Sequence, residues 1–200
     1  MSTRITASFI ACILAIFAGS MALGSLDHDT DQFGVYFDTN GNRNCEVVLP
    51  YYSTDVYVLL MNPGEEVRGF EFSYTVNTSA FVVRLVNEVP GSTMGCLQYS
   101  GNMASGFYKC GISTPLSPAI VLVHWQFLPL EPASVEFRLG PAPNPSLYGG
   151  LPVIYGGTHG VRLAGVASGD PSLPVATWGG PGCPVAEQVS SFGTIKGLFR

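Results

Sequence analysis

Short stretches in which apolar and polar residues alternate recur along most of this chain, and segments rich in glycine, proline or asparagine separate them. The clearest stretch is 135–139, where Val135, Phe137 and Leu139 alternate with polar residues. Successive side chains of a β-strand point to opposite faces, so this alternation predicts a strand with one buried face. The chain also contains 24 glycines and 15 prolines, which interrupt helices and form turns. The pattern therefore predicts an all-β protein.

Several other segments carry the same strand signal, and we expect each strand to be short. One of them, 55–61, is apolar nearly throughout, which predicts a central strand buried on both faces. Another, 120–127, is expected to place Val121 and Trp125 on the same face, because even spacing keeps side chains on one side. The predicted strands are 32–37, 55–61, 67–76, 80–89, 120–127, 135–139, 151–155 and 160–166.

Short strands at regular intervals are typical of an antiparallel sandwich. We therefore expect a single antiparallel β-sandwich of about eight to nine strands over residues 25–200. A closed β-barrel is the alternative architecture. Phe192, Ile195 and Phe199 recur at helical spacing, which leaves a short C-terminal helix open.

Residues 1–24 have the features of a signal peptide. Arg4 precedes an apolar run from Ile5 to Phe17, and small residues follow this run up to Gly24. The run is shorter than the about 20 apolar residues that cross a bilayer as a helix. We therefore expect cleavage, no transmembrane anchor in the mature chain, and a location that is secreted or in the periplasm or cell envelope.

Four cysteines follow the predicted signal peptide: Cys45, Cys96, Cys110 and Cys183. An even number in an exported chain predicts two disulfides, for which the sequence allows three pairings. Cys96 and Cys110 flank Tyr99–Asn102, which can turn back on itself, so we expect these two to pair. Cys45 and Cys183 would then close a long loop. A zinc site is not expected, because the chain lacks a Cys-x-x-Cys spacing.

Part of the chain resembles known β-sandwich families. Val56–Leu59, then Val67–Tyr74 with its Gly-Phe-x-Phe segment, and later Ile120–Leu139 are similar to the strand pattern of cohesin-like and carbohydrate-binding-module-like domains. The resemblance implies a non-catalytic module that binds an extracellular protein or a glycan. The whole chain, ending in Ser191–Arg200, also resembles small exported bacterial β-sandwich proteins of unknown function.

The sequence gives no positive sign of catalysis. It lacks Gly-x-Ser-x-Gly, His-Glu-x-x-His and a glycine-rich phosphate loop. Its formal net charge of −5 argues against nucleic acid or anionic lipid as a partner. We therefore expect a non-catalytic binding or structural protein without a cofactor or metal. A small secreted hydrolase is the alternative, because catalytic groups that meet only in the folded chain leave no motif.

Aromatic rings near predicted loops give the one indication of binding. Exposed rings there can stack on sugars or anchor a protein partner. The candidates are Tyr51, Tyr52, Tyr99, Tyr108, Tyr148 and Trp178.

For three further features of the sequence we expect a structural role rather than a functional one. Glu71 occupies a polar position of an alternating strand and is expected to face solvent. Asp38–Asn42 has oxygen side chains at alternate positions, as calcium loops do, but lacks their closing acid, so a turn is expected. His124 and His159 would support the hydrolase alternative only if a Ser or Asp lay within hydrogen-bond reach in a pocket.

An intact-mass measurement tests the predicted export. Protein recovered from its own culture fractions is expected to lack about 22–24 N-terminal residues. Thiol alkylation without reductant is expected to add no mass, since all remaining cysteines would be paired. A full-length mass with alkylated thiols would contradict both expectations.

Overall fold

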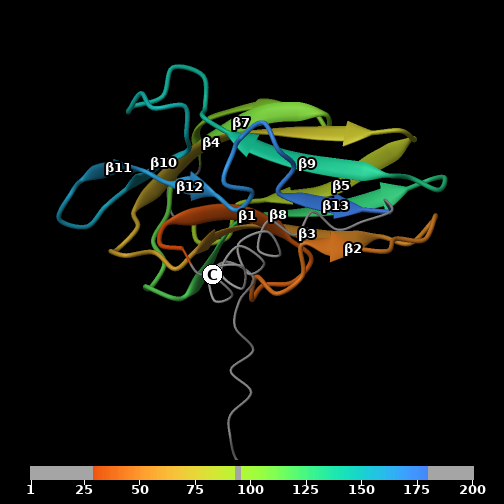
Figure 1. Ribbon diagram of the computed structural model, residues 1–200, viewed down its shortest axis with the longest axis horizontal. Helices are drawn as coiled ribbons and strands as arrows, with labels where there is room; N and C mark the ends of the chain where they lie inside the picture. The colour runs from red at the N-terminus through yellow and green to blue at the C-terminus, as the bar shows by residue number, and fades with distance from the viewer. Residues whose placement is uncertain (1–28, 93–95, 180–200) are drawn as a thin grey trace, which may run out of the picture.

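The computed structural model describes residues 29–92 and 96–179, in which the regular elements are all β-strands (Figure 1). Residues 1–24, Cys183 and the predicted C-terminal helix lie outside the described residues. The strands form two sheets whose facing sides enclose one main hydrophobic core. No strand of one sheet pairs with a strand of the other in this part of the chain. The predicted sandwich is therefore confirmed, and the barrel alternative is wrong.

The first sheet contains β1 (Gln32–Tyr36), β3 (Thr54–Met61), β5 (Val82–Glu88), β8 (Ala119–Pro129) and β12 (Gly165–Val166). Their order across the sheet is β12-β1-β3-β8-β5. β3 lies in the middle, as its nearly continuous apolar run predicted.

The second sheet contains β2 (Cys45–Glu46), β4 (Gly69–Thr78), β6 (Cys96–Gly101), β7 (Ser105–Gly111), β9 (Val135–Gly140), β10 (Val153–Tyr155), β11 (Val161–Leu163) and β13 (Ala176–Trp178). β4 is central. On one side it pairs with β7, which pairs with β6. On its other side it pairs with both β10 and β9. Further out in the sheet, β11 pairs with β10 on one side, and β13 pairs with β9 and β2 on the other.

Two details of the strand prediction are wrong. The pairs β1–β12 and β13–β2 are parallel, so the sheets are mixed rather than antiparallel. Residues 29–92 and 96–179 also form thirteen strands, because strands as short as β2 and β12 arise by pairing with distant segments and are too short to show an alternation. β6 and β7 are longer but rich in glycine and polar residues, which conceals them in the sequence.

Aromatic rings from both sheets form the centre of the core. Trp125 of the first sheet lies against Tyr74 and Phe137 of the second, with ring centroids 5.0 and 6.5 Å away. Its indole N–H donates a hydrogen bond of 3.0 Å to the Tyr108 hydroxyl. These four side chains are at most 3% exposed. Apolar burial of this kind stabilises a fold by about 1.5–3 kcal/mol for a side chain the size of Phe.

A bulge in β8 changes which of its side chains face the core. Opposite Val58 and Leu59 of β3 the register shifts, and Leu122 is the additional residue. Trp125 lies in the core, whereas Val121 packs with Leu59 in a small cluster on the outer face of the first sheet. The expectation that Val121 and Trp125 share a face is therefore wrong, because one additional residue reverses the alternation.

The turn after β1 packs over this outer cluster. Asp38 Oδ1 accepts the backbone N–H groups of Asn40 and Asn42, so the predicted turn is confirmed. Gly41 has a φ of 72°, and a Cβ there would lie 2.3 Å from the terminal methyl of Met61. Only glycine combines this backbone conformation with such a close approach.

Truncating a central ring tests the importance of the aromatic core. Phe137→Ala is expected to lower the free energy of unfolding by about 3–5 kcal/mol, because it leaves a cavity between the sheets. Urea unfolding of the folded chain measures this. Phe81→Ala is the control, since Phe81 is 63% exposed, and a change of less than about 0.5 kcal/mol is expected there. Equal losses in both variants would contradict the assigned core.

Candidate functional site

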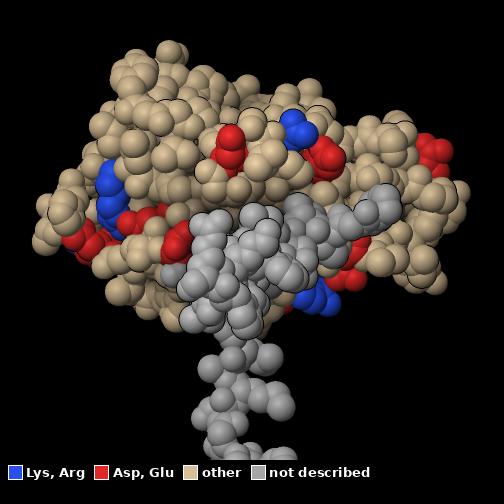
Figure 2. Space-filling model, in the orientation of Figure 1, with Lys and Arg blue, Asp and Glu red and all other residues tan. Residues whose placement is uncertain are grey.

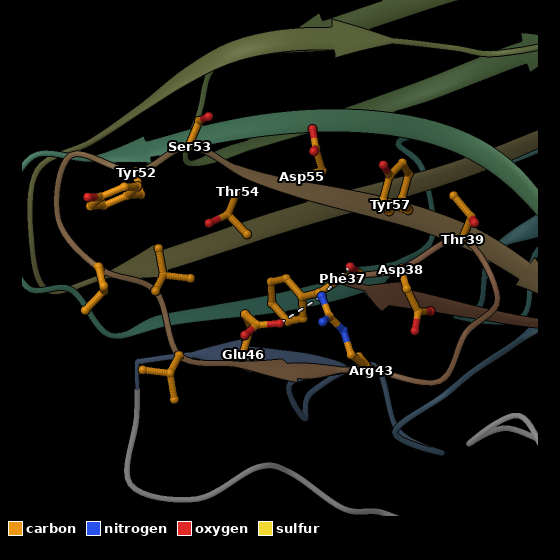
Figure 3. Close-up of a pocket in the computed structure, with 13 residues that line it drawn as sticks. Phe37, Asp38, Thr39, Arg43, Glu46, Tyr52, Ser53, Thr54, Asp55 and Tyr57 are labelled. Carbon is orange, nitrogen blue, oxygen red and sulfur yellow. Dashed lines mark hydrogen bonds and ion pairs between the residues drawn. The ribbon is translucent and has the colours of Figure 1, made fainter. Parts of the chain in front are cut away.

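An open hollow of about 620 Å³ lies between the segment around β2 and the beginning of β3 (Figure 3). Tyr52, Thr54 and Asp55 line it on the β3 side. Arg43 and Glu46 line it on the β2 side and form an ion pair of 2.9 Å. The hollow therefore combines an aromatic ring with hydroxyl and charged groups.

Beside the hollow, four apolar side chains of one short segment are exposed, and we call them the apolar ridge. They are Val47, Leu49, Tyr51 and Tyr52, with exposed fractions of 80%, 61%, 74% and 68%. Val47 and Leu49 were not predicted, although an apolar run that ends at Pro50 without strand alternation is the sequence signal for them.

The backbone of the ridge is held by specific hydrogen bonds. The N–H of Tyr51 donates to the carbonyl of Pro129 at the end of β8 (2.8 Å), and the N–H of Tyr52 donates to that of Leu49 (3.3 Å). Tyr51 has a φ of 66°, a left-handed conformation that is unfavourable for a residue with a large side chain. The chain thus presents the two tyrosine rings to solvent from a fixed backbone.

His124 connects the hollow to the outer face of the first sheet. Its Nε2 lies 2.9 Å from Asp55, which lines the hollow, and its Nδ1 lies 3.5 Å from Glu88. The Tyr57 ring stacks on the imidazole with centroids 5.0 Å apart. Asp55 supplies the neighbour that the hydrolase alternative required. In the described residues, however, no serine or threonine hydroxyl bonds to His124, so a nucleophile–base pair is not formed.

His159 takes part in a different, exposed arrangement. Its Nδ1 lies 2.7 Å from Glu65, which also accepts a hydrogen bond from the Thr158 hydroxyl (2.8 Å). The Thr158 hydrogen bond, with a smaller contribution from His159, lowers the pKa of Glu65 to about 2. The His159 side chain is 74% exposed. This group fastens the loop between β10 and β11 to Glu65, in the segment that precedes β4.

Glu71 is buried, which corrects the expectation that it faces solvent. It is 3% exposed, because the loop after β9 folds over β4 and contributes Ser146. The backbone N–H of Ser146 donates to Oε2 (3.0 Å), the hydroxyls of Ser146 and Tyr155 donate to Oε1, and Lys109 lies 3.5 Å away. Burial alone would raise the pKa of Glu71, but hydrogen bonds from Ser146 and Tyr155 outweigh it and lower the pKa.

The aromatic candidates separate into buried and exposed groups. Tyr108 and Trp178 are 1% and 0% exposed, so both belong to the core and offer no ring to a ligand. Tyr99 is 42% exposed, and Tyr148, in the loop after β9, is 80% exposed. Of the six candidates, only Tyr51 and Tyr52 lie next to each other beside the hollow.

One of the two predicted disulfides is confirmed. Cys96 and Cys110 face each other across the β6–β7 hairpin and are bonded. Cys45 is disulfide-bonded as well. Because Cys183 lies outside the described residues, its pairing with Cys45 stays a prediction.

The described residues show no cluster of three or more His, Cys, Asp or Glu side chains suited to a metal ion. Nor does this part of the chain contain a helix long and apolar enough to cross a membrane. On the face seen in Figure 2, the described Lys and Arg side chains stand singly near Asp and Glu and do not gather into a basic patch.

No protein-family model matches the chain, and no curated protein matches it. Solved structures that resemble it include cohesins. The sixth cohesin of scaffoldin B from Acetivibrio cellulolyticus, solved with a Cel5 dockerin mutant, is 13% identical and has a TM-score of 0.43, with 69% of this chain and 94% of that chain covered. A non-cellulosomal cohesin from Archaeoglobus fulgidus is 14% identical with a TM-score of 0.44, covering 69% and 85%.

A third similar structure is the cohesin module of a family 33 glycoside hydrolase from Clostridium perfringens. It is 9% identical with a TM-score of 0.36, and the match covers 67% of this chain and 90% of that chain. All three similar structures are cohesins, one of the two families whose strand pattern the sequence resembles. At these identities the likeness concerns the fold alone.

The buried Glu71 carboxylate predicts a loss of stability in acid. Folding lowers its pKa, so its contribution is present above the unfolded-state pKa of about 4.3 and is lost as the pH falls through the lower folded-state pKa. Glu71→Gln is expected to cost about 1–3 kcal/mol at neutral pH and to make stability less dependent on pH in acid. Urea unfolding at a series of pH values measures both effects.

Glu66→Gln is the matched control for this measurement. Glu66 forms an exposed ion pair of 3.0 Å with Arg68, and an ion pair in solvent contributes little to stability. If Glu66→Gln reproduced the effect of Glu71→Gln, the role given to the buried carboxylate would be wrong.

Proposed function

We propose that this chain is an exported, non-catalytic β-sandwich module that binds an extracellular protein through the apolar ridge and the neighbouring hollow. The observation that carries the proposal is the exposure of four apolar side chains in one segment, each at least 61% exposed. Soluble proteins rarely leave large apolar groups exposed together unless they form an interaction surface. Aromatic rings are also enriched at the centres of protein interfaces.

The charges around the hollow indicate what kind of protein fits it. Asp38 and Asp55 line it, and Asp55 is 47% exposed. The Arg43 guanidinium is paired with Glu46. A partner that presents apolar side chains beside lysine or arginine therefore complements this surface.

Fixed geometry supports binding as the role of the ridge. The hydrogen bond from Tyr51 to Pro129 and the ion pair between Arg43 and Glu46 hold both walls of the hollow. A surface that is ordered before binding loses less conformational entropy when a partner docks. His124 belongs to this support, since it holds the Asp55 carboxylate on the rim.

A glycan is the second candidate partner. The Tyr52 ring lies in the hollow near Ser53 and Thr54 (Figure 3). A ring beside hydroxyl groups is a combination that binds sugars, because the ring stacks on the C–H face while the polar groups bond to hydroxyls.

Export is supported by the N-terminal sequence and by the Cys96–Cys110 disulfide, which is typical of oxidising compartments.

Point variants of the ridge test the proposed surface. Tyr52→Ala and Leu49→Ser are each expected to weaken binding of the captured and purified extracellular partner by about tenfold or more, as truncation of a central interface residue does. Titration calorimetry with the mature protein measures this. Tyr148→Ala is the control, because Tyr148 is also an exposed tyrosine, at 80%, but lies in a different loop.

The outcomes distinguish the two partners. A purified protein whose affinity falls in the ridge variants but not in Tyr148→Ala supports the proposal. Glycan binding that falls in Tyr52→Ala but not in Leu49→Ser supports the second candidate. Unchanged affinity in both ridge variants, with folding verified by circular dichroism, would refute the assigned surface.

A further inference from the structure

One positive charge in the described residues has no negative partner. Six lysines and arginines lie in this part of the chain, and five of them have a carboxylate within 3.5 Å. The sixth, Arg84, forms no ion pair with any described residue. The paired residues are Arg43, Arg68, Lys109, Arg138 and Arg162.

The position of Arg84 is fixed by the opposite sheet. It belongs to β5, the edge strand of the first sheet, and its guanidinium reaches across to the second sheet. There it donates hydrogen bonds to the hydroxyls of Tyr74 (3.0 Å) and Tyr99 (2.8 Å). It also lies over the Tyr74 ring, 5.9 Å from the centroid. The cation is therefore half-buried and oriented at the side of the sandwich where β5 and β6 are the edge strands.

The tyrosines around Arg84 do not neutralise its charge. Burial raises the pKa of Tyr74 and of Tyr108, so both phenols stay protonated and neutral at physiological pH. Burial alone would lower the pKa of Arg84, but its hydrogen bond to Tyr74 and its electrostatic interactions with Tyr74, Tyr99 and Tyr108 together outweigh this effect, and the pKa is raised. A partly desolvated guanidinium that stays charged can bind an external anion through charge-assisted hydrogen bonds.

Arg84 keeps hydrogen-bonding capacity for such an anion. A guanidinium has about five N–H donors in a planar fork that matches a carboxylate, and two bonds are used by Tyr74 and Tyr99. Tyr99 is 42% exposed, so part of its ring is available for stacking. The neighbouring side chains of Gln98 and Ser100 are polar and exposed.

We propose that Arg84 and Tyr99 form a binding subsite for a glycan that carries a single carboxylate, a sugar acid in an otherwise neutral saccharide. The carboxylate pairs with Arg84, and the sugar ring stacks on Tyr99. The formal net charge of −5 disfavours a polyanionic chain.

Titration of the mature protein tests this subsite independently of the apolar ridge. The probe is a disaccharide with one glucuronate, and the control ligand is the matched glucose disaccharide. Chemical-shift changes in NMR spectra give the affinity and show which residues respond. We expect binding of the glucuronate compound with shifts at Arg84 and Tyr99, and at least tenfold weaker binding of the neutral compound.

Three variants complete the test. Arg84→Gln removes the charge, and Tyr99→Phe keeps the ring but removes the hydroxyl that holds the guanidinium. Arg138→Gln is the control, since Arg138 is half-exposed and paired with Glu136 elsewhere in the second sheet. We expect at least tenfold weaker binding in Arg84→Gln, a smaller loss in Tyr99→Phe and none in Arg138→Gln. Thermal unfolding shows whether each variant is folded. If Arg84→Gln is unfolded, the affinity measured for Tyr99→Phe decides the test.

The following outcomes overturn the proposal. The glucuronate compound does not bind, or the neutral compound binds with equal affinity. The affinity for the glucuronate compound is also the same in Tyr99→Phe and in folded Arg84→Gln as in the unaltered protein. A short acidic peptide that binds at Arg84 more tightly than the sugar acid would refute the glycan assignment.

Discussion

The contact between Trp125 and the rings of the opposite sheet is the interaction on which the rest of this structure depends. Trp125 comes from the first sheet, and Tyr74, Tyr108 and Phe137 come from the second. Because the rings pack across the interface, each sheet buries its apolar face only when the other is in place. Trp178 joins the same group through Phe137, with centroids 6.0 Å apart, which connects the last described strand to the core.

Buried or half-buried ionic contacts then fasten the loops to this core. Glu71 holds the loop after β9 through Ser146 and Tyr155. Arg162 of β11 donates two hydrogen bonds, of 2.8 and 3.1 Å, to the carboxylate of Asp31, which precedes β1 in the other sheet. The pair of Arg162 and Asp31 ties one sheet to the other, since a largely buried charge that loses its partner is costly.

The two surfaces proposed for binding owe their order to this arrangement. The apolar ridge is anchored by a backbone hydrogen bond to the end of β8, the strand that carries Trp125. Arg84 is oriented by Tyr74, whose ring packs on Trp125. Both surfaces therefore project from side chains or backbone that the core already holds, and such preorganisation reduces the entropic cost of binding. They also differ in chemistry, since one exposes apolar groups and the other a cation that has no ion-pair partner among residues 29–92 and 96–179.

The sequence by itself determined the class of fold, because alternation in segments such as 135–139 reports directly on one buried face. It also identified the Cys96–Cys110 disulfide and the turn at Asp38–Asn42, which depend on residues close together in the chain. Tyr51 and Tyr52 were proposed as binding residues because aromatic residues in loops can be recognised in the sequence alone, and their role in binding stays a prediction.

Only the tertiary structure decided the features that depend on distant segments. The bulge in β8 moved Val121 to the outer face, and the loop carrying Ser146 buried Glu71, whose position in an alternating strand indicated exposure. The meeting of Arg84 with Tyr74 and Tyr99 was likewise decided by which edges of the two sheets lie together. Local patterns fix the direction of a side chain relative to its own strand, whereas its neighbours are set by strand order and register, which the chain adopts only on folding.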